Sequence, residues 1–284
     1  ARVSAVNGGA RSGVTGRVWR MPIPADGYPL AAAVSPRVQV VETTDSTNAD
    51  VVAAVIADDA GWPHLSVLVT TDQRRGRGRL DRTWVTPAGT ALAASVVVRV
   101  GALPVHARGW IPLIAGVAMT RAIAAQLRGI PQAVGLKWPN DVLVEGQKIC
   151  GILAEAVPGE FDAVVVGAGV NTRMPRVDLP VATAGSFAAL GQEADEDKLL
   201  ADYLSVLDEL LAALIAADGD AVAAGVQSAV ESACTTLGAD VAVSLPDGTT
   251  LEGRAERIDA EGRLVVSVGG AEVPVAAGDV THVR

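Results

Sequence analysis

The pattern of hydrophobic and polar positions predicts a chain that mixes strands and helices up to about residue 235 and contains only strands after it. Runs typical of β-strands occur at 38–42, 65–71, 90–100, 134–138, 141–145, 148–157 and 161–170. Helical spacing of apolar residues occurs at 46–59, 110–127 and 195–216, and more weakly at 220–232. Further short strands at 240–245, 249–258, 263–268 and 272–276 favour a small antiparallel barrel. We therefore predict an α+β fold.

These patterns divide the chain into three parts. Residues 1–36 contain several glycines and prolines and little periodicity, so we expect a lead-in that is disordered or extraneous to the fold. The chain begins at Ala1, and Met21 is a candidate natural start. Residues 37–235 form the expected main domain, and residues 236–284 form the expected C-terminal domain.

Composition and charge argue against several classes of function. Half of the residues are hydrophobic, yet no uninterrupted apolar span reaches membrane length, and the first residues lack the apolar stretch of a secretory signal. The formal net charge is −9, so we expect no bulk attraction to DNA or to anionic membranes. The two cysteines form no disulfide framework, and the three histidines show no metal-binding or triad-like spacing. We expect a cytoplasmic protein.

The stretch Asp72–Trp84 contrasts most strongly with this acidic background. Five arginines lie between residues 74 and 82, where only Asp81 opposes them. Gly76 and Gly78 alternate with these arginines, permit positive φ and let backbone amides approach a ligand. A solvated turn, a nucleic-acid patch and a flexible lid over a small anionic ligand all fit such a stretch. The acidic chain argues against the nucleic-acid patch, and we favour the lid.

Two other stretches place polar or glycine residues where a strand ends or a helix begins. Ser46-Thr-Asn48 opens the helix expected at 46–59, where a helix cap explains it as well as a ligand contact does, and both can be true. Gly167-Ala-Gly169 closes a strand and opens no helix, so it is not a dinucleotide fingerprint. Its glycines would allow a ligand to pack on bare backbone.

Four motifs, in this order, resemble those of biotin protein ligases. They are Ser46-Thr-Asn48, Gly76-Arg-Gly-Arg79 with Arg82-Thr-Trp84, Lys137-Trp-Pro-Asn-Asp141 and Lys148-Ile-Cys-Gly-Ile-Leu-Ala-Glu155. The resemblance runs from about Val38 to the C-terminus. It implies a mixed or antiparallel sheet in a catalytic domain of the biotin/lipoate ligase type, followed by a small SH3-like β-barrel. The lead-in is too short for the winged-helix repressor domain of some members, so we expect a form without a DNA-binding domain.

The resemblance also implies a reaction and its partners. Biotin carboxylate would attack the α-phosphorus of ATP to give biotinyl-5′-adenylate and pyrophosphate. A lysine of a biotin carboxyl carrier protein, from acetyl-CoA carboxylase or another biotin-dependent carboxylase, would then attack the adenylate. Biotin and ATP are thus the implied substrates, with Mg²⁺ as the expected ion. No nucleic acid or membrane partner is expected, and both a monomer and a homodimer stay open.

Individual residues receive roles from the same resemblance. Lys148 and Arg79 are the implied catalytic residues. The implied biotin contacts are Ser46, Thr47, Asn48, Gln73, Gly76, Arg77, Gly78, Arg79, Lys148, Gly151, Ile152, Gly167 and Gly169. The implied contacts to ATP or the adenylate are Arg77, Arg79, Arg82, Trp84, Lys137, Asn140 and Asn171. Asp141 is a candidate metal ligand or a brace for the hairpin, and Trp84 would stack on adenine, wall the biotin pocket or simply pack. No residue identifies itself as the general base for lysine transfer.

Two alternatives to a biotin ligase remain at this point. A lipoate or octanoate ligase or transferase would share the fold and the lysine-bearing strand, but the Gly-Arg-Gly-Arg and Lys-Trp-Pro-Asn-Asp segments favour biotin. A regulator that binds biotinyl-adenylate and acts on DNA would need a helix-turn-helix segment, which the sequence does not show.

Overall fold

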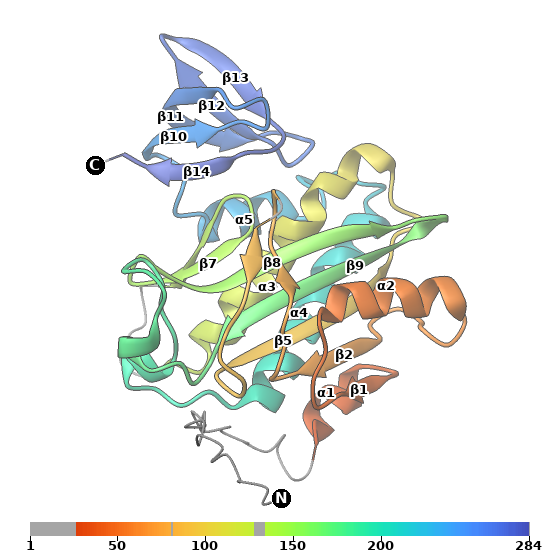
Figure 1. Ribbon diagram of the computed structural model, residues 1–284. Coiled ribbons are helices and arrows are strands. Elements are labelled where there is room, and N and C mark those ends of the chain that lie inside the picture. Colours follow the sequence, from red (N-terminus) through yellow and green to blue (C-terminus); the bar gives the residue numbers. More distant parts are fainter. Residues whose placement is uncertain (1–26, 81, 128–133, 284) are drawn as a thin grey trace, which may run out of the picture.

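The computed structural model describes residues 27–80, 82–127 and 134–283, and its largest element is a seven-stranded sheet (Figure 1). The strands lie in the order β1-β2-β5-β9-β8-β7-β6. Their bounds are β1 Val38–Val40, β2 Val67–Thr70, β5 Ala91–Arg99, β9 Glu160–Asn171, β8 Gln147–Val157, β7 Asp141–Val144 and β6 Val134–Lys137. The pair β1–β2 is parallel and the other neighbouring pairs are antiparallel, which confirms the predicted mixed sheet.

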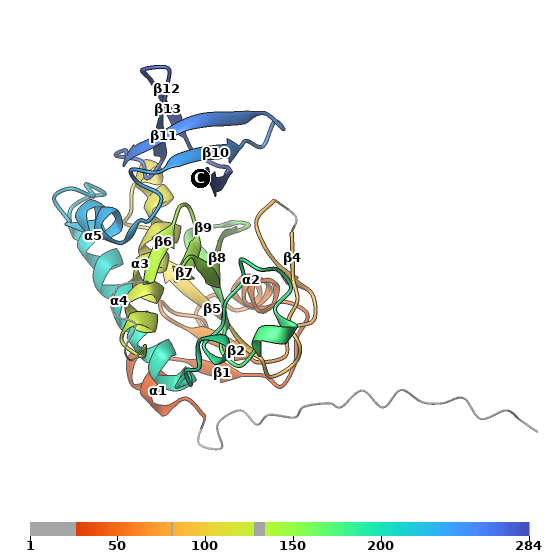
Figure 2. The ribbon, with the colours of Figure 1, turned by 90° about the vertical axis from the view of Figure 1, so that its left-hand side faces the viewer.

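Helices cover both faces of this sheet (Figure 2). One face carries α3 (Ile111–Ala124) and α4 (Glu196–Ala216), with α1 (Pro29–Val34) and α5 (Val226–Ala233) beside them, and the other carries α2 (Thr47–Ala57). Alternate residues of β5 serve the two layers, because Val96 and Val98 belong to the large core, whereas Val97 packs with Val51 and Val55 of α2. A strand buried on both faces is a nearly continuous apolar run, as the sequence at 90–100 is apart from Thr90, Ser95 and Arg99.

The C-terminal part is a five-stranded antiparallel sheet in the order β13-β12-β11-β10-β14. Its strands are β10 Asp240–Ser244, β11 Thr250–Ile258, β12 Leu264–Val268, β13 Ala271–Val275 and β14 Asp279–His282. Two tryptophans of the first domain reach its β11–β12 turn. Trp110 Nε1 donates to the carbonyl oxygen of Ala260 at 2.9 Å, and Trp138 Nε1 donates to that of Gly262 at 3.3 Å.

Several elements differ from the sequence prediction. Part of the expected lead-in forms α1, and Tyr28 and Ala31 are buried in the main core; residues 1–26, with Met21, lie outside the described residues. The helix α5 begins at Val226, later than expected, and β14 was not predicted. Short 3₁₀ helices occupy 105–110, 176–178 and 188–190. Within the described ranges, no helix is long and apolar enough to cross a membrane.

Candidate active site

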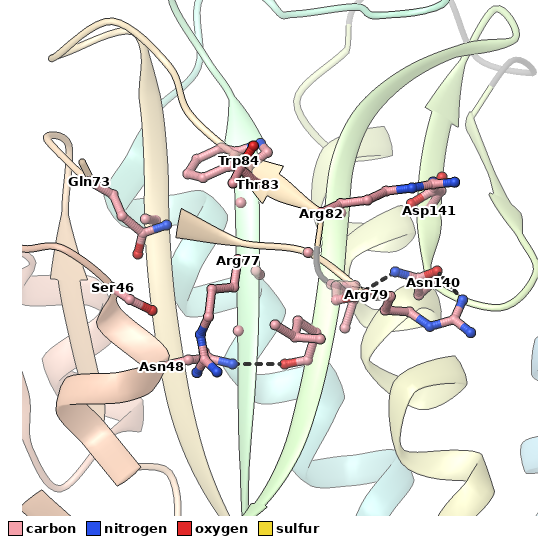
Figure 3. Close-up of a pocket in the computed structure, with 18 of the residues that line it drawn as sticks. Ser46, Asn48, Gln73, Arg77, Arg79, Arg82, Thr83, Trp84, Asn140 and Asp141 are labelled. Carbon is pink, nitrogen blue, oxygen red and sulfur yellow. Dashed lines mark hydrogen bonds between the residues drawn. The ribbon is translucent and has the colours of Figure 1, made fainter. Parts of the chain in front are cut away.

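The stretch Asp72–Trp84 is called the arginine-rich loop. A cavity of about 160 Å³ opens where this loop meets the N-terminus of α2 and the strands β8 and β9 (Figure 3). Strand β14 of the C-terminal sheet also reaches it, through Asp279. The residues that line it are Ser46, Thr47, Asn48, Gln73, Arg77, Gly78, Arg79, Arg82, Thr83, Trp84, Ala93, Asn140, Asp141, Lys148, Gly151, Ile152, Leu153, Gly167, Ala168, Gly169 and Asp279. The cavity therefore draws residues from all four motifs.

Polar side chains at the start of α2 form one wall of the cavity. Ser46 is the N-cap, and its hydroxyl accepts a hydrogen bond from the amide of Ala49 at 3.4 Å, which confirms the predicted cap. Thr47 donates its backbone amide and its hydroxyl to Gln73 Oε1, at 2.8 and 3.0 Å. Asn48 is buried beside them. These polar groups are fixed by neighbours and lie at a helix N-terminus, where a ligand's polar end is readily bound.

The arginine-rich loop is a short hairpin in which β3 (Gly76–Arg77) pairs with β4 (Thr83–Trp84). Gly76 and Gly78, which permit a positive φ, do not adopt one here, whereas Leu80 has φ 52°. Gly76 is required for another reason: a Cβ there would collide with the carbonyl oxygen of Trp84. The loop is therefore held by strand pairing and by the close packing of Gly76 against Trp84.

Glycines of β8 and β9 form a floor of bare backbone under three functional side chains. A Cβ on Gly167 would collide with Asn48 Oδ1, and one on Gly169 would lie 2.8 Å from Cζ2 of Trp84. In β8, a Cβ on Gly151 would lie 3.2 Å from Lys148 Nζ. Asn48 and Trp84 thus lie against Gly167 and Gly169, and both glycines also line the cavity.

Three arginines of the loop line the cavity, and each is paired with a protein oxygen atom. Arg77 Nη2 lies 2.9 Å from Glu155 Oε2. Arg79 Nη1 donates to Asn140 Oδ1 at 3.1 Å (Figure 3) and to the carbonyl oxygen of Gly278 at 3.3 Å. Arg82 forms an ion pair with Asp279. The loop is therefore anchored both to the seven-stranded sheet and to the C-terminal sheet.

Lys148 and Asp141 lie on neighbouring strands at the same end of the cavity. Lys148 Nζ is 2.6 Å from Asp141 Oδ1. Next to them, burial lowers the pKa of Lys137, and the nearby Asp141 acts in the opposite direction. Burial likewise lowers the pKa of Arg79, although Asp279 and Asp141 favour its charged form. Basic groups thus crowd this end of the cavity, which suits it to carboxylate and phosphate oxygens.

Three residues implied by the resemblance do not line the cavity. Gly76 lies under Trp84, and Lys137 lies on β6 opposite Asp141. Asn171 ends β9 and donates its side-chain amide to the carbonyl oxygen of Gly185 at 2.8 Å. The amide of Gly185 in turn donates to the carbonyl oxygen of Lys148 at 2.8 Å, so Asn171 is linked to the cavity through one residue.

Sequence reasoning gave no role to Asp279 of the cavity lining, or to Ser95 and Glu155, which contact the lining residue Asn48. Asp279 comes from β14, and Ser95 comes from the middle of an apolar strand, so neither belongs to a motif. Glu155 ends the quoted Lys148-to-Glu155 motif but received no role. Its acidic side chain in an otherwise apolar strand was the available signal.

Comparison with known proteins identifies the family. Residues 40–171 match the model of the Biotin/lipoate A/B protein ligase family. A Mycobacterium tuberculosis protein named biotin--[acetyl-CoA-carboxylase] ligase is 42% identical over 253 residues, which cover 87% of this chain and 90% of that protein. The chain belongs to the biotin protein ligase family. The family inferred from the four motifs is thus confirmed.

Other biotin protein ligases extend this likeness. The bifunctional ligase/repressor BirA of Escherichia coli is 30% identical over 252 residues, which cover 86% of this chain and 73% of that protein. A structure of the biotin protein ligase from Aquifex aeolicus, in complex with biotin and ATP, matches with a TM-score of 0.69 at 20% identity and covers 87% of this chain and 99% of that one. At that identity the match shows the fold, and it confirms the predicted fold class.

Proposed function

We propose that this protein catalyses the ATP-dependent attachment of biotin to a lysine of a biotin carboxyl carrier domain, through biotinyl-5′-adenylate. The observation that carries the proposal is one cavity that joins four basic side chains, Arg77, Arg79, Arg82 and Lys148, to the polar N-terminus of α2. Biotin has a carboxylate at one end and a polar, uncharged ureido ring at the other. Family membership, together with the name of the Mycobacterium tuberculosis relative, supports biotin as the acid that is activated.

The first step joins two anions, so its barrier depends on fixed positive charge. A carboxylate oxygen of biotin bonds to the α-phosphorus of ATP, the bond from that phosphorus to the leaving pyrophosphate breaks, and biotinyl-5′-adenylate results. Lys148 neutralises the carboxylate and the α-phosphate after it exchanges Asp141 for substrate oxygens. Arg79, held by Asn140 and Gly278, directs a second positive charge to the same oxygens.

The nucleotide occupies the side of the cavity nearest the arginine-rich loop and β14. Arg82 and Arg77 exchange their carboxylate partners for phosphate oxygens, and the indole of Trp84 provides a flat surface for adenine. Asn140 is a further nucleotide contact in the cavity, and Lys137 and Asn171, which do not line it, keep their nucleotide role only as an implication of the resemblance. Biotin lies over β8 and β9, with Ser46, Thr47, Asn48 and Gln73 at its ring and with Gly151, Ile152, Gly167 and Gly169 beneath it.

Magnesium is the ion that we expect to enter with ATP. Across the described ranges, no group of three or more His, Cys, Asp or Glu side chains could hold a metal. Asp141 and Asp279 nevertheless line the cavity, and Mg²⁺ commonly takes one or two carboxylates together with nucleotide phosphates. These residues fit an ion delivered with the nucleotide, with Asp141 as its protein ligand. When bound, the ion would neutralise phosphate charge.

In the second step, a carrier lysine reaches the adenylate as a neutral amine. Its nitrogen bonds to the biotinyl carbonyl carbon, AMP leaves, and an amide results. The acceptor is the biotin carrier domain of acetyl-CoA carboxylase or of another biotin-dependent carboxylase. We place the reaction in the cytoplasm, where the free thiols of Cys150 and Cys234 would stay reduced.

The proposal is tested by ATP–pyrophosphate exchange with labelled pyrophosphate, run separately with biotin, lipoate and octanoate. We expect exchange with biotin only, and loss of exchange when EDTA removes magnesium. Transfer of labelled biotin to a purified biotin carboxyl carrier domain then tests the second step. Exchange with lipoate or octanoate but not with biotin would overturn the proposal that biotin is the substrate. No exchange with any of the three acids would overturn the ligase assignment.

A further inference from the structure

Glu155 on β8 joins the polar N-terminus of α2 to the arginine-rich loop. Its Oε2 atom accepts a hydrogen bond from Asn48 Nδ2 at 2.7 Å and another from Arg77 Nη2 at 2.9 Å. The Glu155 side chain is 25% exposed, so water competes little for this carboxylate. One oxygen atom thus contacts a side chain at the implied biotin-ring end of the cavity and a side chain of the loop.

The contacts of Asn48 fix which end of its amide is available to a ligand. The two hydrogens of Nδ2 are used by Glu155 and by the carbonyl oxygen of Leu153, which lies 3.1 Å away. Both partners are acceptors only, so they cannot serve the amide oxygen. Asn48 Oδ1 therefore lies on the opposite side, 2.5 Å from Ser95 Oγ and against the bare backbone of Gly167. Asn48 presents an acceptor at the cavity wall.

The same network extends to the start of the arginine-rich loop. Ser95 Oγ also lies 2.7 Å from Thr47 Oγ1, whose hydroxyl donates to Gln73 Oε1 at 3.0 Å. Gln73 precedes the loop hairpin, and Arg77 lies within it. A continuous series of side-chain contacts, from Gln73 through Asn48 to Arg77, thus passes along the wall of the cavity, and Glu155 provides its last link.

We propose that Glu155 is a positioning residue for biotin, holding the Asn48 amide so that Oδ1 accepts a hydrogen bond from a ureido N–H. The proposal rests on the proposed function and deepens it, since it specifies the hydrogen-bond polarity of the site. Without Glu155, Nδ2 keeps only the carbonyl oxygen of Leu153 as its acceptor, so the Asn48 amide is held less firmly and can turn Nδ2 toward the ring. A donor would then face a donor, and biotin would lose this hydrogen bond.

The first test measures KM and kcat for biotin and for ATP in biotin-dependent ATP–pyrophosphate exchange, with Glu155→Ala and Glu155→Gln. Glu155→Ala should raise the KM for biotin by about tenfold, the loss expected for one misdirected hydrogen bond, while kcat changes much less and the KM for ATP, through the released Arg77, falls by at most about two- to fivefold. Glu155→Gln keeps one acceptor oxygen and should show a smaller rise. Asp45→Asn is the matched control, because Asp45 pairs with Arg75 of the same loop at 3.6 Å outside the cavity lining, and it should leave the KM for biotin unchanged.

A second readout separates positioning from a merely structural role. Two biotin analogues, each methylated at one ureido nitrogen, lack one N–H at a time. For the analogue without the hydrogen that faces Asn48, the ratio of KM between Glu155→Ala and the parent should fall from about tenfold to about one. If Glu155→Ala fails to fold in a thermal melt, Glu155→Gln provides the same comparison with a smaller ratio.

Three outcomes distinguish the claims. An unchanged KM for biotin in Glu155→Ala would overturn the positioning role. If the ratio of KM between Glu155→Ala and the parent were the same for biotin and for both methylated analogues, the positioning role would be overturned too, since the variant would then weaken the binding of all three ligands equally. A parent enzyme without biotin-dependent exchange would instead overturn the proposed function.

Discussion

At the scale of single residues, the candidate site contains four basic side chains whose protein partners must give way to substrate oxygens. Arg77, Arg82 and Lys148 each pair with a carboxylate of the protein, and Arg79 is bound to neutral oxygens. When no substrate is bound, these partners offset the repulsion between the closely spaced positive charges. In the proposed reaction, substrate anions replace the carboxylates, so each cation would contribute the difference between two pairings rather than a full ion pair.

Lys148 gives the sharpest prediction at this scale. Lys148→Ala should lower kcat in biotin-dependent pyrophosphate exchange by about 10²–10³-fold, the loss typical when one preorganised group that stabilises developing charge is removed. Lys198→Ala is the control, because Lys198 pairs with Asp202 on the exposed side of α4 and should leave exchange unchanged. A Lys148→Ala enzyme that retained more than about a tenth of the parent kcat would contradict this role.

We predict that Arg79 slows the release of bound biotinyl-adenylate. Its guanidinium spans Asn140 and Gly278, so Arg79→Gly should release the loop and shorten the lifetime of bound biotinyl-adenylate by about tenfold or more, as for loss of charged hydrogen bonds. Preformed complex would be followed by gel filtration over time. The control Arg75→Gly changes a side chain that is 81% exposed. Equal lifetimes for Arg79→Gly and the parent would refute the anchoring of the loop by Arg79.

Most cavity residues could be predicted because they lie in contiguous motifs. Residues whose importance depends on a partner in another segment could not. Ser95 is one polar residue in an apolar strand, and only the register of β5 beside α2 places it against Asn48. The packing requirement for glycine at position 76 could not be predicted, since the tight approach of Trp84 is visible only after the hairpin has formed.

At the scale of elements, long periodic segments were predictable and short ones were not. The helix α4 has a continuous apolar stripe and an aspartate cap, and its predicted bounds agree with the structure. The helix α1 has only six residues, and such a helix has little intrinsic stability in water. Its stability comes from tertiary contacts, because the amides of Leu30 and Ala31 donate to the Asp197 carboxylate at 3.0 and 2.9 Å.

This capping contact predicts the effect of Asp197→Ala. Two first-turn amides of α1 would lose their acceptor, so the free energy of unfolding should fall by about 1–2 kcal/mol, as for other helix caps. Urea denaturation would measure the change. The control Asp202→Ala removes an exposed i, i+4 partner of Lys198 on the same helix and should cost less than about 0.5 kcal/mol. Similar losses in the two variants would show that Asp197 does not stabilise α1 in this way.

At the scale of the whole molecule, the C-terminal sheet contributes to the candidate active site. Trp110 and Trp138 dock its β11–β12 turn on the catalytic domain, and Asp279 of β14 lines the cavity. The sequence predicted a C-terminal unit of strands but not this contribution, because β14 has four residues and no motif. How two units meet depends on surface complementarity, which periodicity does not encode.

The pairing of Arg82 with Asp279 leads to a prediction about ATP. Arg82 must leave Asp279 to bind a phosphate, and the pair is partly exposed, so its contribution is roughly 0.2–1 kcal/mol. Asp279→Asn keeps the shape of the side chain and removes a negative charge from a cavity that receives a polyanion. The KM for ATP in biotin-dependent exchange should therefore fall by about two- to fivefold at low salt. The difference in KM for ATP between Asp279→Asn and the parent should shrink at high salt, where screening weakens the pairing of Arg82 with Asp279 in the parent.

The control for this experiment is Asp240→Asn in the same sheet. Asp240 lies 3.9 Å from Arg254 and does not line the cavity, so this variant should leave the KM for ATP unchanged. A higher KM for ATP in Asp279→Asn would contradict competition between the carboxylate and the nucleotide. In that case Asp279 would serve to hold Arg82 ready for the phosphate, and the C-terminal sheet would act by ordering the loop.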